Sequence, residues 1–447
     1  MQGFFKWSGL VVFGMVVLVI AAYCASRWIP MPTEDEKALA WLDAPRPLAG
    51  TNGFAALWSL PFDIPVADAE RLLKEETVRL QALPLWSGEG AAPVHTSPLE
   101  TYPRLDDTSD DKTLCKAGQP HCLAQVRARL QELTPVMASR AAITARIAAL
   151  DDYDHFRSPF PARPDTPMPF YRPLMQGLVA HAYTFARGDR EAGLRGVCRM
   201  GSIARKLAGS GDNLLGGVMG AVLMDASGAL FVDMLAELPG DHPLPDVCTG
   251  VFEPDGGMVA GICTTMAGEA RYTAAVFRAL NVAGAESSWH RKVVADLFLD
   301  QRKTIARGAR RHAWFCSAQA DALIRADTPL GRDAPLSGGW TFSCLANATG
   351  CILDNIAAPS LAGYAERFQD AEARLRLVAA WRWLREAHDD ARPVAQRIAA
   401  WQQLHPEGRA IRVTADGNGL EIDLFHNMQV STFALPLPSR SAASPAP

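Results

Sequence analysis

Residues 181–200 read HAYTFARGDREAGLRGVCRM, and this stretch is the clearest indication of the fold class. Gly188 and Asp189 separate two segments in which small and apolar side chains recur at helical spacing. Glycine commonly follows the last turn of a helix, and aspartate commonly caps the first turn of the next one. The stretch therefore predicts two helices joined by a tight turn.

This hairpin resembles one helix-turn-helix unit of the tetratricopeptide repeat family. A second segment, DASGALFVDML from Asp225, echoes part of the pattern, but its spacing from Gly188 does not match the family's repeat of roughly 34 residues. The resemblance covers one unit only. We therefore expect a series of α-hairpins and not a repeat protein.

Helical patterns continue on both sides of the hairpin, and most are separated by glycine or proline. The longer helices are expected at residues 174–187, 190–208, 214–238, 258–280, 288–325 and 357–391. Near the C-terminus, apolar and polar residues alternate on both sides of Asp416 and Gly417, which predicts a β-hairpin. The predicted fold class is mainly α, with a single N-terminal transmembrane helix, a multi-helical α-hairpin array and a small C-terminal β-hairpin.

Composition divides the chain into five expected parts. Residues 158–173 are dense in proline and mark the main boundary. The parts are an N-terminal transmembrane anchor with its flanks at 1–28, a membrane-proximal helical region with a long Pro/Asp-rich loop at 29–160, an Ala/Leu-rich helical domain at 161–405, the β-hairpin at 406–436 and a disordered tail at 437–447.

The overall composition excludes several classes of protein. Of the 447 residues, 49% are hydrophobic and 21% are charged, which does not fit a disordered chain, a coiled-coil rod or a transporter with many spans. The formal net charge is -4, so the whole-chain electrostatics do not favour a polyanion. Nucleic acid is therefore not an expected partner.

The apolar run at residues 9–25, GLVVFGMVVLVIAAYCA, predicts a membrane anchor. It contains no charge and is just long enough to cross a bilayer core of roughly 30 Å. Trp7 and Trp28 flank the run, as is typical at the two membrane interfaces. A cleaved signal peptide is the alternative, but Tyr23 and Cys24 interrupt the small residues that a cleavage site requires. We expect an uncleaved span that contacts the lipid bilayer through residues 9–25.

Eight cysteines lie outside the span and are candidates for disulfides. Three pairs are close in sequence, and two cysteines remain: Cys115 with Cys122, Cys248 with Cys263, Cys344 with Cys351, and possible further partners Cys198 and Cys316. Disulfides persist only in an oxidising compartment. The alternative is a set of reduced core cysteines, which suits Cys198 and Cys316 because each lies in a helical pattern. We expect two to four disulfides, an inner (cytoplasmic) membrane location and a C-terminal domain on the periplasmic side.

Two groups of charged residues are candidate site residues. Glu269 and Arg271 interrupt a helix of small and apolar residues, and with His290 they are candidate catalytic residues, provided that they converge in a cleft. The alternative is structural pairing, since a buried carboxylate needs a partner.

The second group is a basic stripe on the helix expected at 288–325. At 3.6 residues per turn, Lys303, Arg307 and Arg310 share one face, which is suited to phosphate headgroups or an acidic partner. The alternative is a solvated face paired with acidic neighbours such as Asp300.

No motif of the sequence identifies a reaction. There is no G-x-S-x-G, no H-E-x-x-H, no Walker loop and no C-x-x-C, so neither a metal site nor a cofactor is expected. The anchored helical architecture favours an interaction or assembly module with an envelope protein as partner. The second hypothesis is an envelope hydrolase or lyase with an acid/base site between helices.

Overall fold

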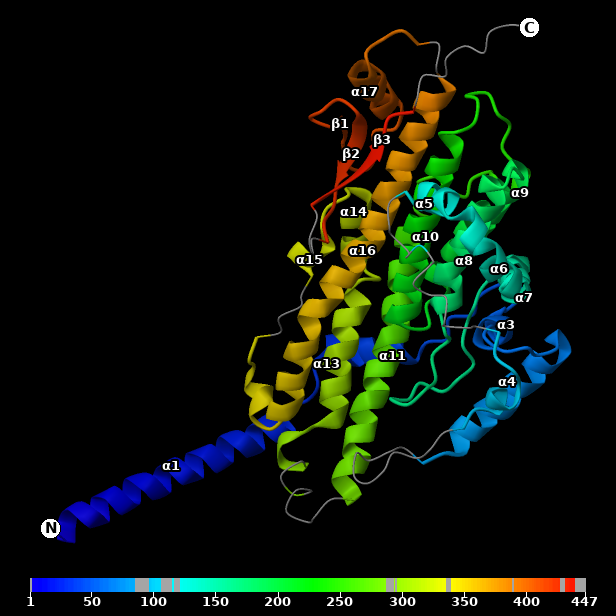
Figure 1. Ribbon diagram of the computed structural model, residues 1–447. Helices are drawn as coiled ribbons and strands as arrows, with labels where there is room; N and C mark the ends of the chain where they lie inside the picture. Colours follow the sequence, from blue (N-terminus) through cyan, green and yellow to red (C-terminus); the bar gives the residue numbers. More distant parts are fainter. Residues whose placement is uncertain are drawn as a thin grey trace, which may run out of the picture.

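The structure is a computed structural model that describes residues 2–84, 96–105, 115, 121–286, 293, 296–334, 339–387, 390–426 and 431–438. The protein is mainly helical, with a small three-stranded antiparallel sheet near its C-terminus. Figure 1 shows long helices packed side by side, with the first helix projecting alone from one corner of the molecule.

The helices before the long bundle are α1 (Gln2–Trp28), α2 (Thr33–Asp43), α3 (Phe54–Trp58), α4 (Val66–Ala82), α5 (Cys122–Ala128), α6 (Leu130–Ser139) and α7 (Ala141–Ala149). The bundle and the C-terminal elements are α8 (Arg172–Ala186), α9 (Arg190–Ser210), α10 (Leu214–Leu235), α11 (Gly257–Glu286), α13 (Gln301–Trp314), α14 (Ala318–Arg325), α15 (Leu330–Asp333), α16 (Ala348–Glu386), α17 (Val394–Leu404), β1 (Ile411–Val413), β2 (Gly419–Asp423) and β3 (Thr432–Pro436). Short 3-10 helices include η4 (Asp246–Cys248) and η5 (Phe342–Leu345).

The helical hairpin predicted around Gly188 is present as α8 and α9. Gly188 has a φ of 107°, a left-handed conformation that glycine adopts without a steric penalty. The Asp189 side chain accepts a hydrogen bond from the Ala192 N–H and so caps α9. Asn213 caps α10 in the same way through the Gly216 N–H. Local capping chemistry therefore sets both turns.

Helix α10 forms the centre of the core and packs against α8, α9, α11 and α16. It comes very close to α9, since a Cβ at Gly220 would lie 2.6 Å from the backbone nitrogen of Ala208. Among the described residues, two helices are long and apolar enough to cross a membrane, Leu10–Trp28 and Leu214–Leu235. The second is 72% buried inside the protein and the first only 6%, so α10 serves as a core helix while α1 leaves its apolar side chains exposed.

One core joins segments from several of the expected parts of the chain. Its buried side chains include Phe156, Leu174 and Trp381, together with Ile422 of the sheet. The Trp381 indole N–H donates a hydrogen bond to the Pro436 carbonyl at 2.7 Å, which fixes β3 to α16. The proline-rich segment at 158–173 therefore connects two parts of the chain that both contribute side chains to one core.

The helix predicted at 288–325 is wrong as a single element. Residues 287–292 and 294–295 lie outside the described part of the chain, and from Gln301 onward the segment forms two helices, α13 and α14. The Ser317 hydroxyl accepts a hydrogen bond from the Ala320 N–H, which starts a new helix. Cys316, just before it, is bonded to Cys263 of α11. A cap and a long-range disulfide together end α13 at Trp314.

The C-terminal β-hairpin is present as β1 and β2, but a third strand extends it to a sheet. The pairings include Ile411 with Ile422 and Leu420 with Leu435. Leu420, Ile422 and Leu435 are buried, so the sheet lays one face on the helical core. The sequence did not predict β3 because this short strand is defined by its pairing with β2 and by the burial of Leu435, which adjacent residues do not express.

Four disulfides are present, and two of them differ from the expected pairs. Cys115–Cys122 and Cys344–Cys351 join the close pairs. The expected Cys248–Cys263 pair is wrong, and Cys198–Cys248 and Cys263–Cys316 form instead, with Cα atoms 4.9 and 4.8 Å apart. The reason is that η4 packs on α9 while α11 packs on α13, which brings sequence-distant cysteines together. Disulfides on this scale indicate an oxidising compartment.

Candidate functional site

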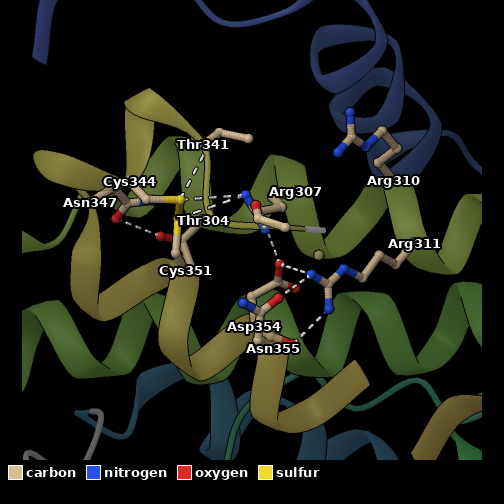
Figure 2. Close-up of polar contacts among 12 residues, drawn as sticks. Thr304, Arg307, Arg310, Arg311, Thr341, Cys344, Asn347, Cys351, Asp354 and Asn355 are labelled. Atoms are coloured by element: carbon tan, nitrogen blue, oxygen red, sulfur yellow. Dashed lines mark hydrogen bonds and ion pairs between the residues drawn. A yellow bond between two sulfur atoms is a disulfide. The ribbon is translucent and has the colours of Figure 1, made fainter. Parts of the chain in front are cut away.

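The basic stripe of α13 is engaged in contacts within the protein. Arg307 is buried, and its Nε atom lies 2.7 Å from a carboxylate oxygen of Asp354 (Figure 2). Arg310 lies 3.2 Å from Asp35 of α2. Lys303 extends to the last turn of α1. The alternative of a solvated face paired with acidic neighbours such as Asp300 holds in part, since Lys303 lies 3.8 Å from Asp300 and Arg310 is 46% exposed. It does not apply to Arg307, which is buried, and the stripe joins α13 to α1, α2 and α16.

Asp354 of α16 is the acidic centre of this contact. It accepts from Arg307 and also lies 2.7 Å from an Nη atom of Arg311, whose other Nη atom donates to the Asp354 backbone carbonyl. The side chains of all three residues are at most 8% exposed. Figure 2 shows the Cys344–Cys351 disulfide on the far side of Arg307, with its sulfur atoms 3.6 and 3.7 Å from the guanidinium. Two buried cations thus share one buried anion.

A cavity of about 580 Å³ lies beside this cluster, between α10, α11, α13 and α16; we call it the central cavity. Its volume falls in the range of small-molecule sites, roughly 300 to 1,000 Å³. The apolar lining comprises Leu214, Leu215, Val218, Met219, Val222, Phe277 and Leu361. The polar lining comprises Glu269, Thr273, Arg311, His312, Asp354, Tyr364 and Arg367. An apolar wall with convergent polar groups is the usual character of a ligand-binding pocket.

Glu269 of α11 lines this cavity without an ionic partner among the described residues. Within the described part of the chain its carboxylate accepts one hydrogen bond, from the Leu214 N–H to Oε2 at 3.1 Å, at the start of α10. Burial raises the pKa of Glu269, and this hydrogen bond lowers it by less. The carboxyl group can therefore hold a proton, or accept hydrogen bonds from a bound molecule, without breaking a salt bridge.

His312 of α13 also lines the central cavity, and one of its two ring nitrogens has no hydrogen-bond partner among the described residues. Its Nδ1 lies 2.8 Å from the Gly308 carbonyl, which can only accept, so Nδ1 carries the proton. Nε2 is buried and has no hydrogen-bond partner in the described part of the chain. Burial lowers the pKa of His312 to about 4, so the ring is neutral at pH 7. Nε2 is consequently a hydrogen-bond acceptor.

Of the candidate catalytic residues, Glu269 and Arg271 are not brought together. Glu269 lines the central cavity, whereas Arg271 does not line it and has Arg157 and Asp212 as its charged neighbours. His290 lies outside the described residues. Burial lowers the pKa of Arg271, and the Arg157 charge lowers it further. The two-residue separation on one helix accounts for this divergence.

His312 was not identified as a site residue from the sequence, where it follows the basic residues Arg310 and Arg311. His312 is four residues after Gly308, so the two residues are neighbours along a helix. This spacing alone does not indicate that the histidine lines a cavity. What singles it out is α11 and α16 packing around it. That packing depends on residues far away in sequence.

A larger cavity of about 760 Å³ lies where α16 and α17 meet the loop before α11, and its carboxylates Asp327 and Glu372 have protein partners, although Nη2 of Arg409 has no hydrogen-bond partner among the described residues. Asp327 pairs with Arg409. Glu372 accepts hydrogen bonds from the Gly256 and Met258 N–H groups. Both oxygens of each of these carboxylates have a protein partner, whereas only Oε2 of Glu269 has one among the described residues.

Comparisons with known proteins found no match, so the functional argument depends on the geometry of the site. No model of a known protein family, no curated protein and no solved structure matches the chain. Within the described residues, no group of three or more His, Cys, Asp or Glu side chains is placed to hold a metal ion. The central cavity, with Glu269 and His312, is therefore the candidate functional site.

Proposed function

We propose that the protein is a single-pass, membrane-anchored interaction module of the cell envelope that binds a small amphipathic ligand in its central cavity. Helix α1 would span the inner membrane, and the disulfide-bonded domain would lie on the periplasmic side. The exposed apolar surface of α1 and the four disulfides support this placement. An envelope protein is the expected macromolecular partner.

The observation that carries the binding proposal is the buried Nε2 of His312, which has no hydrogen-bond partner among the described residues and lines the same cavity as Glu269, a carboxyl group with no ionic partner among them. Unsatisfied buried polar atoms are costly, at roughly 1 to 3 kcal/mol each, and are uncommon without a role. His312 Nε2 accepts hydrogen bonds, and so does ionised Glu269. A ligand that matches this cavity would have an apolar part, which contacts the Leu, Val and Phe side chains, and a polar end with hydroxyl or amine donors, which faces His312 and Glu269.

Gly308 offers a way to fill the cavity without disturbing its walls. A Cβ added there would meet only an Asp354 oxygen, at the ordinary contact distance of 3.8 Å. We expect Gly308→Leu to abolish ligand binding because the added side chain takes the ligand's space. The measurement is mass spectrometry of small molecules that copurify with the full-length protein and are released by denaturation.

Gly308→Ala is the matched control, since it adds one methyl group and improves helix propensity by about 1 kcal/mol. It should retain the ligand and fold at least as well as the wild type. Equal ligand recovery from the Leu variant and the wild type would contradict the proposal, as would the absence of any bound molecule from all three proteins.

A hydrolase or lyase is the second candidate function, and one observation favours it. A carboxyl group with a raised pKa and a neutral imidazole line the same cavity, which is the composition of an acid/base pair. Under this hypothesis, Glu269→Gln would purify with an intact substrate while the wild type carries its products. Identical molecules on both proteins would favour simple binding.

A further inference from the structure

Segments that are far apart in sequence meet around the last two turns of α1. The Tyr23 hydroxyl donates to the Leu297 carbonyl at 2.7 Å, and its ring packs edge-on against Phe298. The Ser26 hydroxyl donates to the Phe342 carbonyl at 2.8 Å. On the other side, the Lys303 ammonium donates to the Arg27 carbonyl at 3.1 Å. The end of α1 is therefore held directly by the domain.

Large apolar side chains are exposed on these segments and on the first turns of α16, which follows η5. We call the set the apolar rim; it comprises Phe298, Trp340, Phe342, Leu345, Ile352 and Ile356, each between 39% and 71% exposed. The sequence from 339 to 353, GWTFSCLANATGCIL, contains no charged residue. A cluster of exposed apolar side chains of this kind is typical of an interaction surface.

The position of these contacts along α1 indicates where the apolar rim would lie relative to a membrane. Tyr23 and Ser26 precede Trp28 by five and two residues, which at 1.5 Å per residue places them about 3 to 8 Å inside the end of the apolar helix. Their neighbours Phe298 and Phe342 lie at the same level. In a bilayer crossed by α1, this level is the boundary between hydrocarbon and headgroups, where aromatic side chains are favoured.

We propose that the apolar rim inserts into the membrane interface, so that the domain rests on the lipid surface around α1 and does not swing from a flexible tether. This inference depends on the proposed membrane span of α1. Its occupant is the bilayer because Phe298 and Phe342 of the rim lie directly beside Tyr23 and Ser26, at the end of the exposed apolar surface of α1.

A disulfide and a buried arginine also fix the backbone of the apolar rim. The Cys344–Cys351 disulfide ties η5 to the first turn of α16, next to Leu345 and Ile352. The buried Arg307 lies against that disulfide and donates to the Gly339 carbonyl, one residue before Trp340. A preformed rigid surface loses little conformational entropy when it enters the interface.

The test uses three positions that are equally exposed in the structure. Ile356 of the rim is 71% exposed, Leu18 of α1 is 70% exposed, and Leu404 at the end of α17 is 72% exposed. Figure 1 places α17 at the opposite end of the molecule from α1. A photoreactive p-benzoylphenylalanine would replace one of these residues at a time in the full-length protein. Illumination of native membranes is followed by mass spectrometry of covalent adducts.

We expect lipid adducts at Ile356 in a yield similar to that at Leu18 and at least about tenfold above that at Leu404. The same label in place of Trp340 repeats the measurement on a second segment. Lipid adducts at Leu18 together with background yields at Ile356 and Trp340 would overturn the rim proposal alone. Background yields at all positions would overturn the span as well, and a protein adduct at Ile356 would replace the bilayer with a protein partner.

Discussion

Removing the carboxylate of Asp354 is expected to lower the free energy of unfolding by about 3 to 5 kcal/mol, because Arg307 and Arg311 would remain buried without an anion. Asp354→Ala tests this directly. Asp354→Asn keeps the size and the acceptor oxygen but not the charge, and should also destabilise strongly. Urea unfolding of the detergent-solubilised protein, followed by tryptophan fluorescence, measures both variants.

The exposed ion pair between Arg412 and Asp423 supplies the control. Its atoms approach to 2.6 Å, but the side chains are 45% and 54% exposed. Arg412→Ala should therefore cost at most about 1 kcal/mol. If Asp354→Ala costs no more than Arg412→Ala, then the two guanidinium groups reach water and the cluster is not a buried one.

Loss of the Cys198–Cys248 disulfide is the second large effect that we expect. The bridge closes a sequence separation of 50 residues, for which the chain-entropy model gives about 4 kcal/mol of stabilisation. The double variant Cys198→Ala with Cys248→Ala should lose stability of that order. The midpoint of denaturant unfolding, compared at constant slope, measures the loss.

The short Cys344–Cys351 bridge is a matched control, since its cysteines are as deeply buried but only seven residues apart. Replacing both with alanine should cost about 2 kcal/mol in the same model. Equal losses from the two double variants would show that loop closure does not determine the stabilisation. An unchanged stability without Cys198 and Cys248 would show that this disulfide does not form.

Local features of the fold were predictable from the sequence because local chemistry produces them. The turn at Gly188 and the cap at Asp189 depend on residues within one helical turn. The hairpin around Gly417, with a φ of 74°, likewise needs no distant partner. Such features follow from backbone preferences that a few adjacent residues express.

Long-range pairing was not predictable in this way. Proximity in sequence suggested a bond between Cys248 and Cys263, but the packing of η4 on α9 brings Cys248 to Cys198. Similarly, nothing adjacent to Arg307 in sequence indicates Asp354, its partner on another helix. The identity of a partner is a property of helix packing, which many weak contacts decide jointly.

The candidate site was recovered in part for the same reason. Glu269 stood out because a charge in an apolar helix needs an explanation, and it does line the central cavity. His312 did not stand out, since it follows several basic residues in a pattern that is typical of a charged surface. Its burial comes from α11 and α16, so only the tertiary structure distinguishes it from its neighbours.

The most direct measurement of the membrane-anchored arrangement is protease accessibility of a C-terminal tag in spheroplasts, combined with alkaline extraction of the membranes. We predict that the chain keeps α1, stays in the membrane pellet at high pH, and loses its tag to protease added outside. Recovery of a soluble chain that lacks residues 1–25 would contradict the anchor. A tag that is digested only after lysis would contradict the periplasmic placement of the domain.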